Sequence, residues 1–542
     1  MRPRSTFPFS GLLLTVLAAL LAALVVVPSL AGPAHADDGA DGSSSASPND
    51  AQDVAEQALA TVEGIIDGDV EPLVPSPDPT IEEPVPAQPR PASADLTLAL
   101  RDLAARTEDL PTSKQDEARR ILARPDGSVG GCDSLACWDR GASASRTCGS
   151  RVCVHWVRDG ADRSTKAWAQ QALRVVNGVA LRYKRAGYRV PKNDHHEGFK
   201  VDVYLADLGN AGVYGYCGTD RAITSHAAYS AYCVLDNNYA RSEYGTATSA
   251  TDLLKVTAAH EFFHAVQFAY DALEDLWFME ATATWVEDEV FDNINDNRFY
   301  LRYGPMGRPG QSMTTVNAAS EYGAWSFFRF LTEKYAYSRA GLPVLVRKMW
   351  EAAAAGGPKA RGMYSIPAIR WALATRGTTI STQFSSYAAR NRQPKRYYQE
   401  GAAYPVAKPR GSYLLTAGQR EVDLSFGLDD LASKTMRYYP GAAMGKTWKL
   451  QIAADVNAHP AGGSVVVTVK PHGRKPTMSR MKLNGAGVGS QVRGFGKRVD
   501  WVEVTVVNAS PRFVCTGEHD GPCEGYSVDD GSPQALNVLA YR

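Results

Sequence analysis

The sequence of 542 residues lacks a net charge, because 58 basic residues balance 58 acidic ones. It also lacks a basic run with interleaved aromatic residues, the pattern that follows a nucleic-acid backbone. We therefore expect no nucleic-acid partner. No GxSxG serine elbow, Walker loop or dinucleotide-binding glycine fingerprint occurs either. Chemistry that depends on those motifs is not predicted.

Long apolar runs are scarce, and the one that exists lies near the start, at residues 12–27. Two arginines precede it, and the Ala-His-Ala tripeptide at 34–36 follows it. This pattern predicts a signal peptide over residues 1–36 and a secreted, extracellular mature chain with no membrane partner. An uncleaved anchor is the alternative, since the run and its flanks approach the ~20 residues that span a bilayer.

Cysteine is sparse, and all eight residues follow the predicted signal. An even count in an exported chain predicts disulfides, and no CxxC spacing indicates a zinc knuckle or a redox site. The pairing among the first four stays open, whereas the last two form the clearest pair. In order, the close pairs are Cys132 and Cys137, Cys148 and Cys153, Cys217 and Cys233, and Cys515 and Cys523.

The composition changes along the N-terminal part of the chain. Residues 37–95 are rich in Pro, Ser and Asp, which predicts a disordered linker with one helix-like patch at 54–66. Residues 96–125 return to helical spacing, with Pro111 between two short helices. This helical presegment is either a removable propeptide or a hairpin packed permanently on the next domain.

The rest of the chain predicts an α+β fold in two domains. Residues 126–403 mix strands with helices, and the strand at 231–237 is either a sheet edge that pairs with an extended substrate or a buried central strand. Residues 404–542 contain short strands separated by turn residues, which predicts a C-terminal β-sandwich. The predicted strands are 153–157, 200–208, 231–237, 448–456, 464–470, 501–508 and 535–541; the predicted helices are 165–186 and 251–270.

One motif carries chemistry: His260, Glu261 and His264 form HExxH in a helical run that begins near Ser249 or Thr251. Residues four apart lie about one turn round and roughly 6 Å along a helix, so both imidazoles face one cation. Neutral imidazole is a good zinc ligand. We predict that the two histidines bind one Zn²⁺ per chain and that Glu261 is the general base.

The third ligand must lie elsewhere, because Gln267 and Tyr270 occupy the Gly and His positions of the longer metzincin motif. Glu280 opens a second helical stretch, and a ligand on a rigid helix is well positioned against the histidines. Glu280 is therefore the predicted third ligand. Three acidic residues of the connecting segment compete with it: Asp271, Glu274 and Asp275.

These motifs resemble the gluzincin pattern HExxH…E(G/A)xAx(W/Y), since Ala281, Ala283 and Trp285 follow Glu280. The chain is also similar to a group of exported bacterial metallopeptidases over KVDVYLADLG, YGYC, WVEDEVFD and VNASPRFVC. The resemblance implies a zincin-like domain over 126–403 and an endopeptidase that hydrolyses protein or peptide substrates with a metal-activated water.

Two features depart from the gluzincin pattern. Glu280 lies only 16 positions after His264, and Thr284 stands where some members carry an Asp behind the ligands. Tyr322 is the candidate for oxyanion stabilisation, because a YG-containing helix recurs here in gluzincin-like enzymes. Its alternative role is packing against the apolar residues 325–331.

Other functions and ions stay open. The DNINDN segment at 292–297 is a candidate Ca²⁺ site, although it lacks EF-hand spacing and the distal Glu. One alternative function is a non-catalytic adhesion or carbohydrate-binding protein, whose structural zinc needs a fourth protein ligand. The other is a zinc hydrolase of non-peptide substrates.

Overall fold

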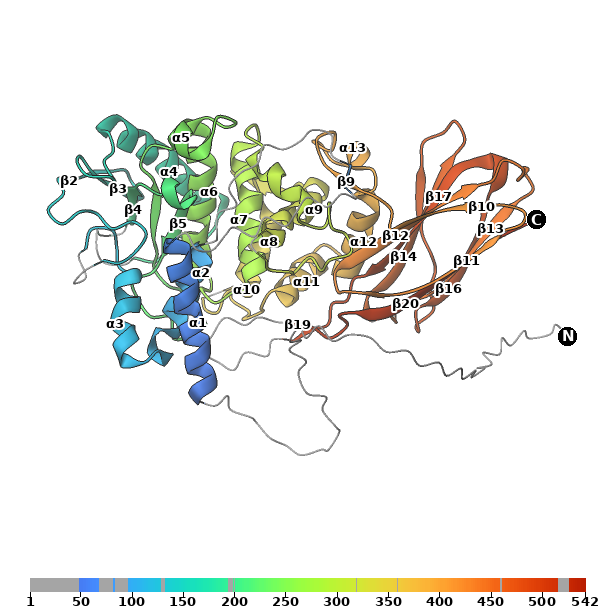
Figure 1. Cartoon of the computed structure of the whole chain (residues 1–542), viewed down its shortest axis with the longest axis horizontal. Coiled ribbons are helices and arrows are strands. Elements are labelled where there is room, and N and C mark those ends of the chain that lie inside the picture. Colours follow the sequence, from blue (N-terminus) through green and yellow to red (C-terminus); the bar gives the residue numbers. More distant parts are fainter. Residues whose placement is uncertain are drawn as a thin grey trace, which may run out of the picture. The chain divides into compact units, whose positions relative to one another are not determined.

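Helices and mixed β-sheets make an α+β fold, as the sequence predicts (Figure 1). The predicted signal peptide, most of the predicted linker and the predicted Cys515–Cys523 pair lie outside the residues that the structure describes. The described residues belong to one unit, Ala46–Arg542. This computed structural model describes residues 48–67, 81–82, 96–127, 132–193, 198, 200–317, 319–357, 359–458, 461–514 and 526–542.

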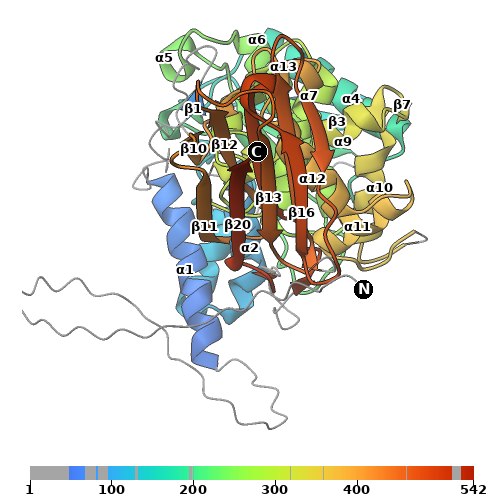
Figure 2. The same ribbon diagram turned by 90° about the vertical axis from the view of Figure 1, so that its right-hand side faces the viewer.

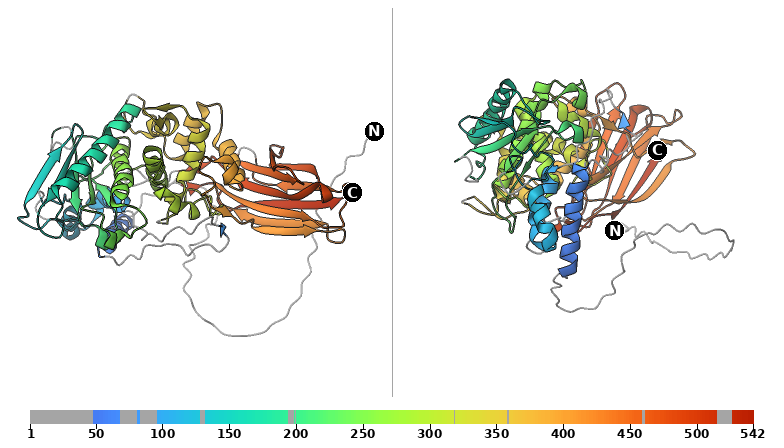
Figure 3. Two further views of the ribbon diagram at one scale, coloured as in Figure 1. Left: turned by 90° about the horizontal axis from the view of Figure 1, so that it is seen from above. Right: turned by 60° about the vertical axis from the view of Figure 1, so that its left-hand side comes forward.

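Three helices precede the first large sheet. α1 spans Pro48–Ile66, so it begins earlier than the helical patch predicted inside the linker. Pro48 suits a first helical position, where a missing N–H costs nothing. α2 (Leu96–Arg106) and α3 (Thr112–Ile121) lie on either side of Pro111, as predicted. α1 packs on α2 (Figure 3, right). Buried apolar side chains of all three helices join the main core.

A five-stranded mixed sheet follows, in the order β2-β3-β4-β6-β5. β3, β4 and β6 are parallel, whereas β2 and β5 run antiparallel at the two edges. The prediction that residues 231–237 form an edge is therefore wrong, and its alternative, a central strand, is right. After β4 the chain forms the edge strand β5 and then returns as β6, which lies between β4 and β5. The bounds are β2 Ala144–Cys148, β3 Val152–Val157, β4 Val201–Ala206, β5 Gly215–Gly218 and β6 Tyr232–Asp236.

The two long predicted helices are present as α4 (Lys166–Ala186) and α6 (Ala250–Phe268). Ser249 caps α6, because its Oγ accepts a hydrogen bond from the N–H of Asp252 at 3.1 Å. α6 is buried on nearly every side between strands β5 and β6, α4 and the next long helix, α7 (Leu276–Phe291).

Shorter helices and two-residue strands fill the region between α7 and the C-terminal strands. Those helices are α8 Ser320–Gly323, α9 Trp325–Lys334, α10 Val344–Ala353, α11 Ile366–Ala374, α12 Ile380–Arg390 and α13 Pro394–Tyr397; α5 (Arg241–Tyr244) precedes α6. The short pairs are β7 (Ser338–Arg339) with β8 (Leu342–Pro343), and β1 (Ile81–Glu82) with β9 (Val406–Ala407).

The C-terminal strands form a five-stranded sheet, β10-β12-β17-β14-β15, and a four-stranded sheet, β11-β20-β13-β16, which Figure 2 views face-on. Alternate side chains of both sheets share one apolar cluster, for example Val504 on β17 and Ile452 on β13. The four strands predicted here are present, and five more strands of these two sheets were missed among the described residues. The bounds are β10 Gly411–Leu415, β11 Glu421–Leu428, β12 Ala432–Pro440, β13 Lys449–Asp455, β14 Gly463–Pro471, β15 Thr477–Arg480, β16 Val488–Gly494, β17 Val499–Asn508 and β20 Ser532–Tyr541, with a short pair β18 Phe513–Val514 and β19 Tyr526–Ser527.

Three of the predicted cysteine pairs are disulfides. The pairing left open among the first four cysteines joins near neighbours in the sequence. The third bond joins edge strand β5 to β6. In the part of the chain that the structure describes, no helix has the length and apolar character to cross a membrane. The disulfides are Cys132–Cys137, Cys148–Cys153 and Cys217–Cys233.

Candidate metal centre

The three predicted ligands meet between α6 and α7. His260 and His264 come from α6, and Glu280 comes from the first turns of α7. His260 Nε2 lies 3.1 Å from Glu280 Oε2, and His264 Nε2 lies 3.1 Å from Glu280 Oε1. All three residues are buried. One nitrogen from each ring and the carboxylate therefore point at a common centre.

The atoms at this centre suit a cation better than they suit each other. His264 Nε2 and Glu280 Oε1 are close but lack hydrogen-bond geometry, and neither has another hydrogen-bond partner among the described residues. A buried polar atom without a partner costs about 1–3 kcal/mol. A metal ion would satisfy both atoms, and two imidazole nitrogens with one carboxylate are a typical three-residue zinc donor set.

The other nitrogen of each imidazole is held by a side chain from the same two helices. His260 Nδ1 lies 2.7 Å from Glu287 Oε1, and His264 Nδ1 lies 2.7 Å from Gln267 Oε1. A hydrogen bond at Nδ1 fixes the proton there and leaves Nε2 as the free ligand atom. Sequence reasoning missed Gln267 and Glu287. Helical spacing was the available signal, because Glu287 follows Glu280 by two turns and Gln267 follows His264 by one.

Removing the Glu287 carboxylate should weaken metal binding. In Glu287→Ala, His260 loses the acceptor that orients its ring, so we expect the zinc dissociation constant to rise about 10- to 100-fold. Competition against a chromophoric chelator measures this constant. Glu289→Ala is the matched control, because the Glu289 carboxylate accepts a hydrogen bond from Thr332 on α9 and not from a ligand. Equal affinity in both variants would remove Glu287 from the site.

The electrostatics of the centre are dominated by the buried carboxylates. Burial lowers the pKa of His260, but Glu280 and Glu287 outweigh this effect and raise that pKa well above its usual value. Burial raises the pKa of Glu280, but the imidazoles of His264 and His260 outweigh this effect and lower the pKa well below its usual value. The carboxylate therefore stays ionised. Burial also raises the pKa of the Glu261 carboxyl, which suits a group that must accept a proton.

Glu261 lies beside the predicted ligands and contacts two other elements. Its Oε2 accepts a hydrogen bond from the Thr97 hydroxyl of α2 at 3.1 Å. The same hydroxyl oxygen accepts the Cys217 N–H of edge strand β5 at 3.0 Å. β5 approaches α6 closely at Gly215, where a β-carbon would lie 3.1 Å from Glu261 Cγ. The predicted base therefore sits between its own helix, the sheet edge and α2.

Tyr322 also lies at the centre. Its ring stacks against His260, with 6.0 Å between the ring centroids and 24° between the planes. It also stacks on Tyr300, from the 3₁₀ helix Asp296–Arg302, with 4.7 Å between the ring centroids. The residue is buried on α8. The two predicted roles of Tyr322, oxyanion stabilisation and packing against residues 325–331, both stay predictions.

Comparisons with known proteins do not identify the chain. No protein-family model matches it, and no curated protein does. Among solved structures, it is similar to the Aeromonas hydrophila periplasmic g-type lysozyme inhibitor PliG, with 14% identity over 24% of this chain and 99% of that one, at a TM-score of 0.14. The surface-associated copper-binding protein CorA of Methylomicrobium album BG8 gives 11% identity, 24% and 98% coverage and a TM-score of 0.14. Such low scores assign neither fold nor function.

The competing ligands and the candidate calcium segment lie apart from the histidines' centre. Asp271 Oδ2 lies 2.9 Å from His226 Nδ1, and Asp275 accepts a hydrogen bond from the Trp277 indole. Within the described residues, the groups suited to a metal ion include neither these acids nor the 292–297 segment. A second acidic group does occur at Asp207, Asp236 and Glu243.

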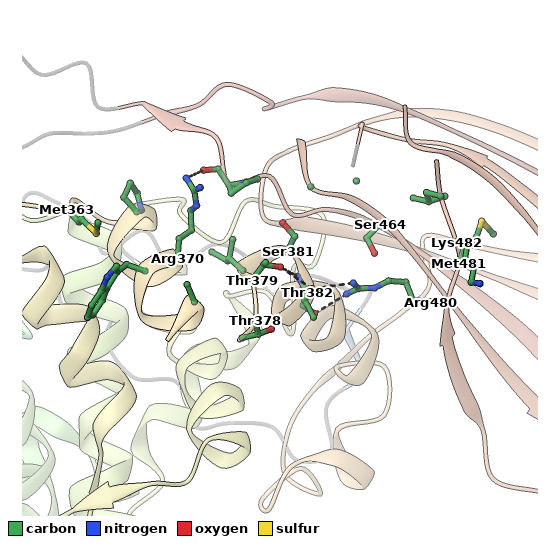
Figure 4. Close-up of a pocket in the computed structure, with 18 residues that line it drawn as sticks. Met363, Arg370, Thr378, Thr379, Ser381, Thr382, Ser464, Arg480, Met481 and Lys482 are labelled. Carbon is green, nitrogen blue, oxygen red and sulfur yellow. Dashed lines mark hydrogen bonds between the residues drawn. The ribbon is translucent and has the colours of Figure 1, made fainter. Parts of the chain in front are cut away.

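A cavity of about 840 Å³ lies elsewhere, between α11 and α12 on one side and β14 and β15 on the other. Arg480 reaches the carbonyl of Thr382 at 3.1 Å across it (Figure 4). Its wall also includes Arg370 and Ser381 but no His, Cys, Asp or Glu among the described residues. This cavity is therefore separate from the metal centre.

Proposed function

We propose that the chain is an exported zinc endopeptidase of the gluzincin type, with a zincin-like domain over 126–403 and a C-terminal β-sandwich over 404–542. One observation carries the proposal: His260, His264 and Glu280 direct their ligand atoms at one centre with Glu261 beside it. Three protein ligands leave a coordination position for substrate, as in catalytic zinc sites. A structural zinc would need a fourth protein ligand, and the group contains three among the described residues.

The roles of the chain's own residues follow from this arrangement. His260, His264 and Glu280 would hold the zinc ion, which when bound would supply Lewis-acid activation of a water molecule and of the scissile carbonyl. Glu261 takes the proton from the attacking water and passes it to the leaving amine, since its burial-raised pKa favours such transfer. Tyr322, stacked beside His260, donates a hydrogen bond to the developing oxyanion.

The sheet edge favours a peptide as the substrate. β5 is antiparallel to β6, and its Cys217 N–H points at the Thr97 hydroxyl next to Glu261. The backbone of an extended peptide that paired with this edge strand would pass next to Glu261. The three disulfides support export, because such bonds persist in oxidising compartments.

Metal content and metal dependence test this function. The full chain purified without chelators should contain one zinc ion, which 1,10-phenanthroline removes together with cleavage of unfolded protein substrates. Added zinc should restore both. The non-chelating isomer 1,7-phenanthroline is the matched control for inhibition by the ring system alone. A chain without zinc, or one whose peptide cleavage survives metal removal, would contradict the proposal.

A further inference from the structure

α2 covers the metal centre. Thr97 in its first turn bridges Glu261 and the Cys217 N–H of the sheet edge, the two groups that the proposed function assigns to a substrate. His260 and Glu261 are only 8% and 7% exposed, and Glu280 is fully buried. A peptide cannot reach these groups while α2 occupies this position.

Arg101 follows Thr97 by one helical turn and is buried against the same site. It is 1% exposed. Its Nη1 donates to the carbonyl of Glu274 at 2.7 Å and lies 3.3 Å from the sulfur of Met279. Met279 directly precedes the ligand Glu280. The guanidinium of α2 therefore lies against Glu274 and Met279, and Met279 is the sequence neighbour of the ligand Glu280. We call the position that this guanidinium fills the Arg101 pocket.

The Arg101 pocket is acidic. Glu274 is 0% exposed, and its Oε2 has no hydrogen-bond partner among the described residues. Burial raises the pKa of Tyr364, the carboxylates of Asp275, Glu274 and Asp271 raise it further, and Arg101 lowers it. Burial, and next the Asp271 carboxylate, also raise the pKa of Glu274 well above its usual value. A buried guanidinium is stable only where nearby carboxylates compensate its charge.

We propose that this pocket is the subsite for an arginine or lysine side chain of the substrate, and that α2 fills it in a latent form of the enzyme. The proposal rests on the proposed peptidase function. When α2 withdraws, Asp102, which pairs with Arg101 on the same helix, leaves with it. The pocket then keeps the carboxylates of Asp271, Glu274 and Asp275 and takes another cationic side chain.

α2 can withdraw from the centre without the reduction of a disulfide bond. The first cysteine of the chain is Cys132, so no disulfide holds the helices of residues 48–127. The contacts that keep α2 over the centre include those of Arg101 and Thr97, the buried side chains of Leu98 and Leu100, and the Ala104 carbonyl, which accepts the Ile223 N–H at 3.0 Å. Weakening the contacts of Arg101 or of Thr97 should expose the site.

The first test concerns the pocket alone. Zinc-loaded full chain carrying Arg101→Ala is heated with ethylguanidine or with uncharged ethylurea. Ethylguanidine should raise the Tm of this variant and leave the wild type unchanged, because only the variant has an empty cationic site. Arg119→Ala, which removes an exposed arginine of α3, is the control and should not respond. No response of Arg101→Ala to ethylguanidine overturns the proposal.

The second test concerns cleavage. Arg101→Ala should cleave a mixed peptide library about tenfold or more faster than the wild type, because the competent population rises. The cleaved bonds should carry Arg or Lys at one fixed position. Arg101→Met keeps the apolar stem and provides the same readout if the alanine variant does not fold. Cleavage without a basic preference overturns the subsite and leaves the peptidase standing, whereas ethylguanidine binding without any cleavage overturns the peptidase and not the pocket.

Discussion

A Glu261→Gln chain should keep its zinc and lose at least about 100-fold in kcat/KM for peptide cleavage. The amide has the size of the carboxylate, and its oxygen can still accept the hydrogen bond from Thr97. It cannot take a proton from the attacking water. Glu261→Gln should lower the rate by the same factor in the wild-type chain and in the Arg101→Ala chain. Within each of these two backgrounds, α2 limits substrate access equally with and without the Glu261→Gln substitution.

Two measurements distinguish loss of the general base from misfolding: the zinc content of Glu261→Gln, and the activity of a control variant at another glutamate. Glu333→Gln is the matched control, because Glu333 pairs with Arg329 on α9 and contacts no predicted ligand. Its rate should equal that of the wild type. Full activity in Glu261→Gln would reject the general-base role, and loss of zinc in that variant would show that Glu261 supports the ligands instead.

Local patterns predicted the parts of the site that lie within one helix. The HExxH spacing placed His260 and His264 on one face of α6, and Ser249 marked its start. Glu280 was predictable because α7 begins with a buried apolar stretch. The helix and strand periodicities are local, so they survive in the folded chain wherever tertiary contacts agree with them.

Contacts between distant segments were not predictable from those patterns. Thr97 and Glu261 are 164 positions apart, and Arg101 and Glu274 are 173 apart. Nothing in the local sequence around α2 indicates which element it covers. The same limit explains the sheet edge: β5 and β6 both have strand propensity, and only the pairing order decides that β5 is outermost.

Composition misled the prediction for the start of one helix. The helix-like patch predicted at 54–66 is present as the end of α1, but the helix begins earlier, at Pro48. The apolar residues that dock α1 on the core, including Leu59 and Val62, lie in the predicted part. The first residues of the helix are mostly polar, so an average over the segment does not separate them from the linker.

Replacing Glu280 by Gln should abolish tight zinc binding. The amide is a poor metal ligand, so the dissociation constant should rise by more than the about 100-fold typical of residues behind the ligands. At a zinc concentration 1,000 times the wild-type constant, zinc adds about 4.1 kcal/mol to the free energy of unfolding, and a 100-fold weaker variant gains only about 1.4 kcal/mol.

Denaturant unfolding of each chain with and without zinc measures this difference, and Glu289→Gln on the same helix is the control that should keep the full gain. Because the comparison is made within each variant, the stability change caused by removing a buried carboxylate cancels. If zinc raised the free energy of unfolding of Glu280→Gln as much as that of the wild type, Glu280 would not be the third ligand, and the acidic residues at 271–275 would be the next candidates. That result would also require the Arg101 pocket and the metal centre to share the same carboxylates.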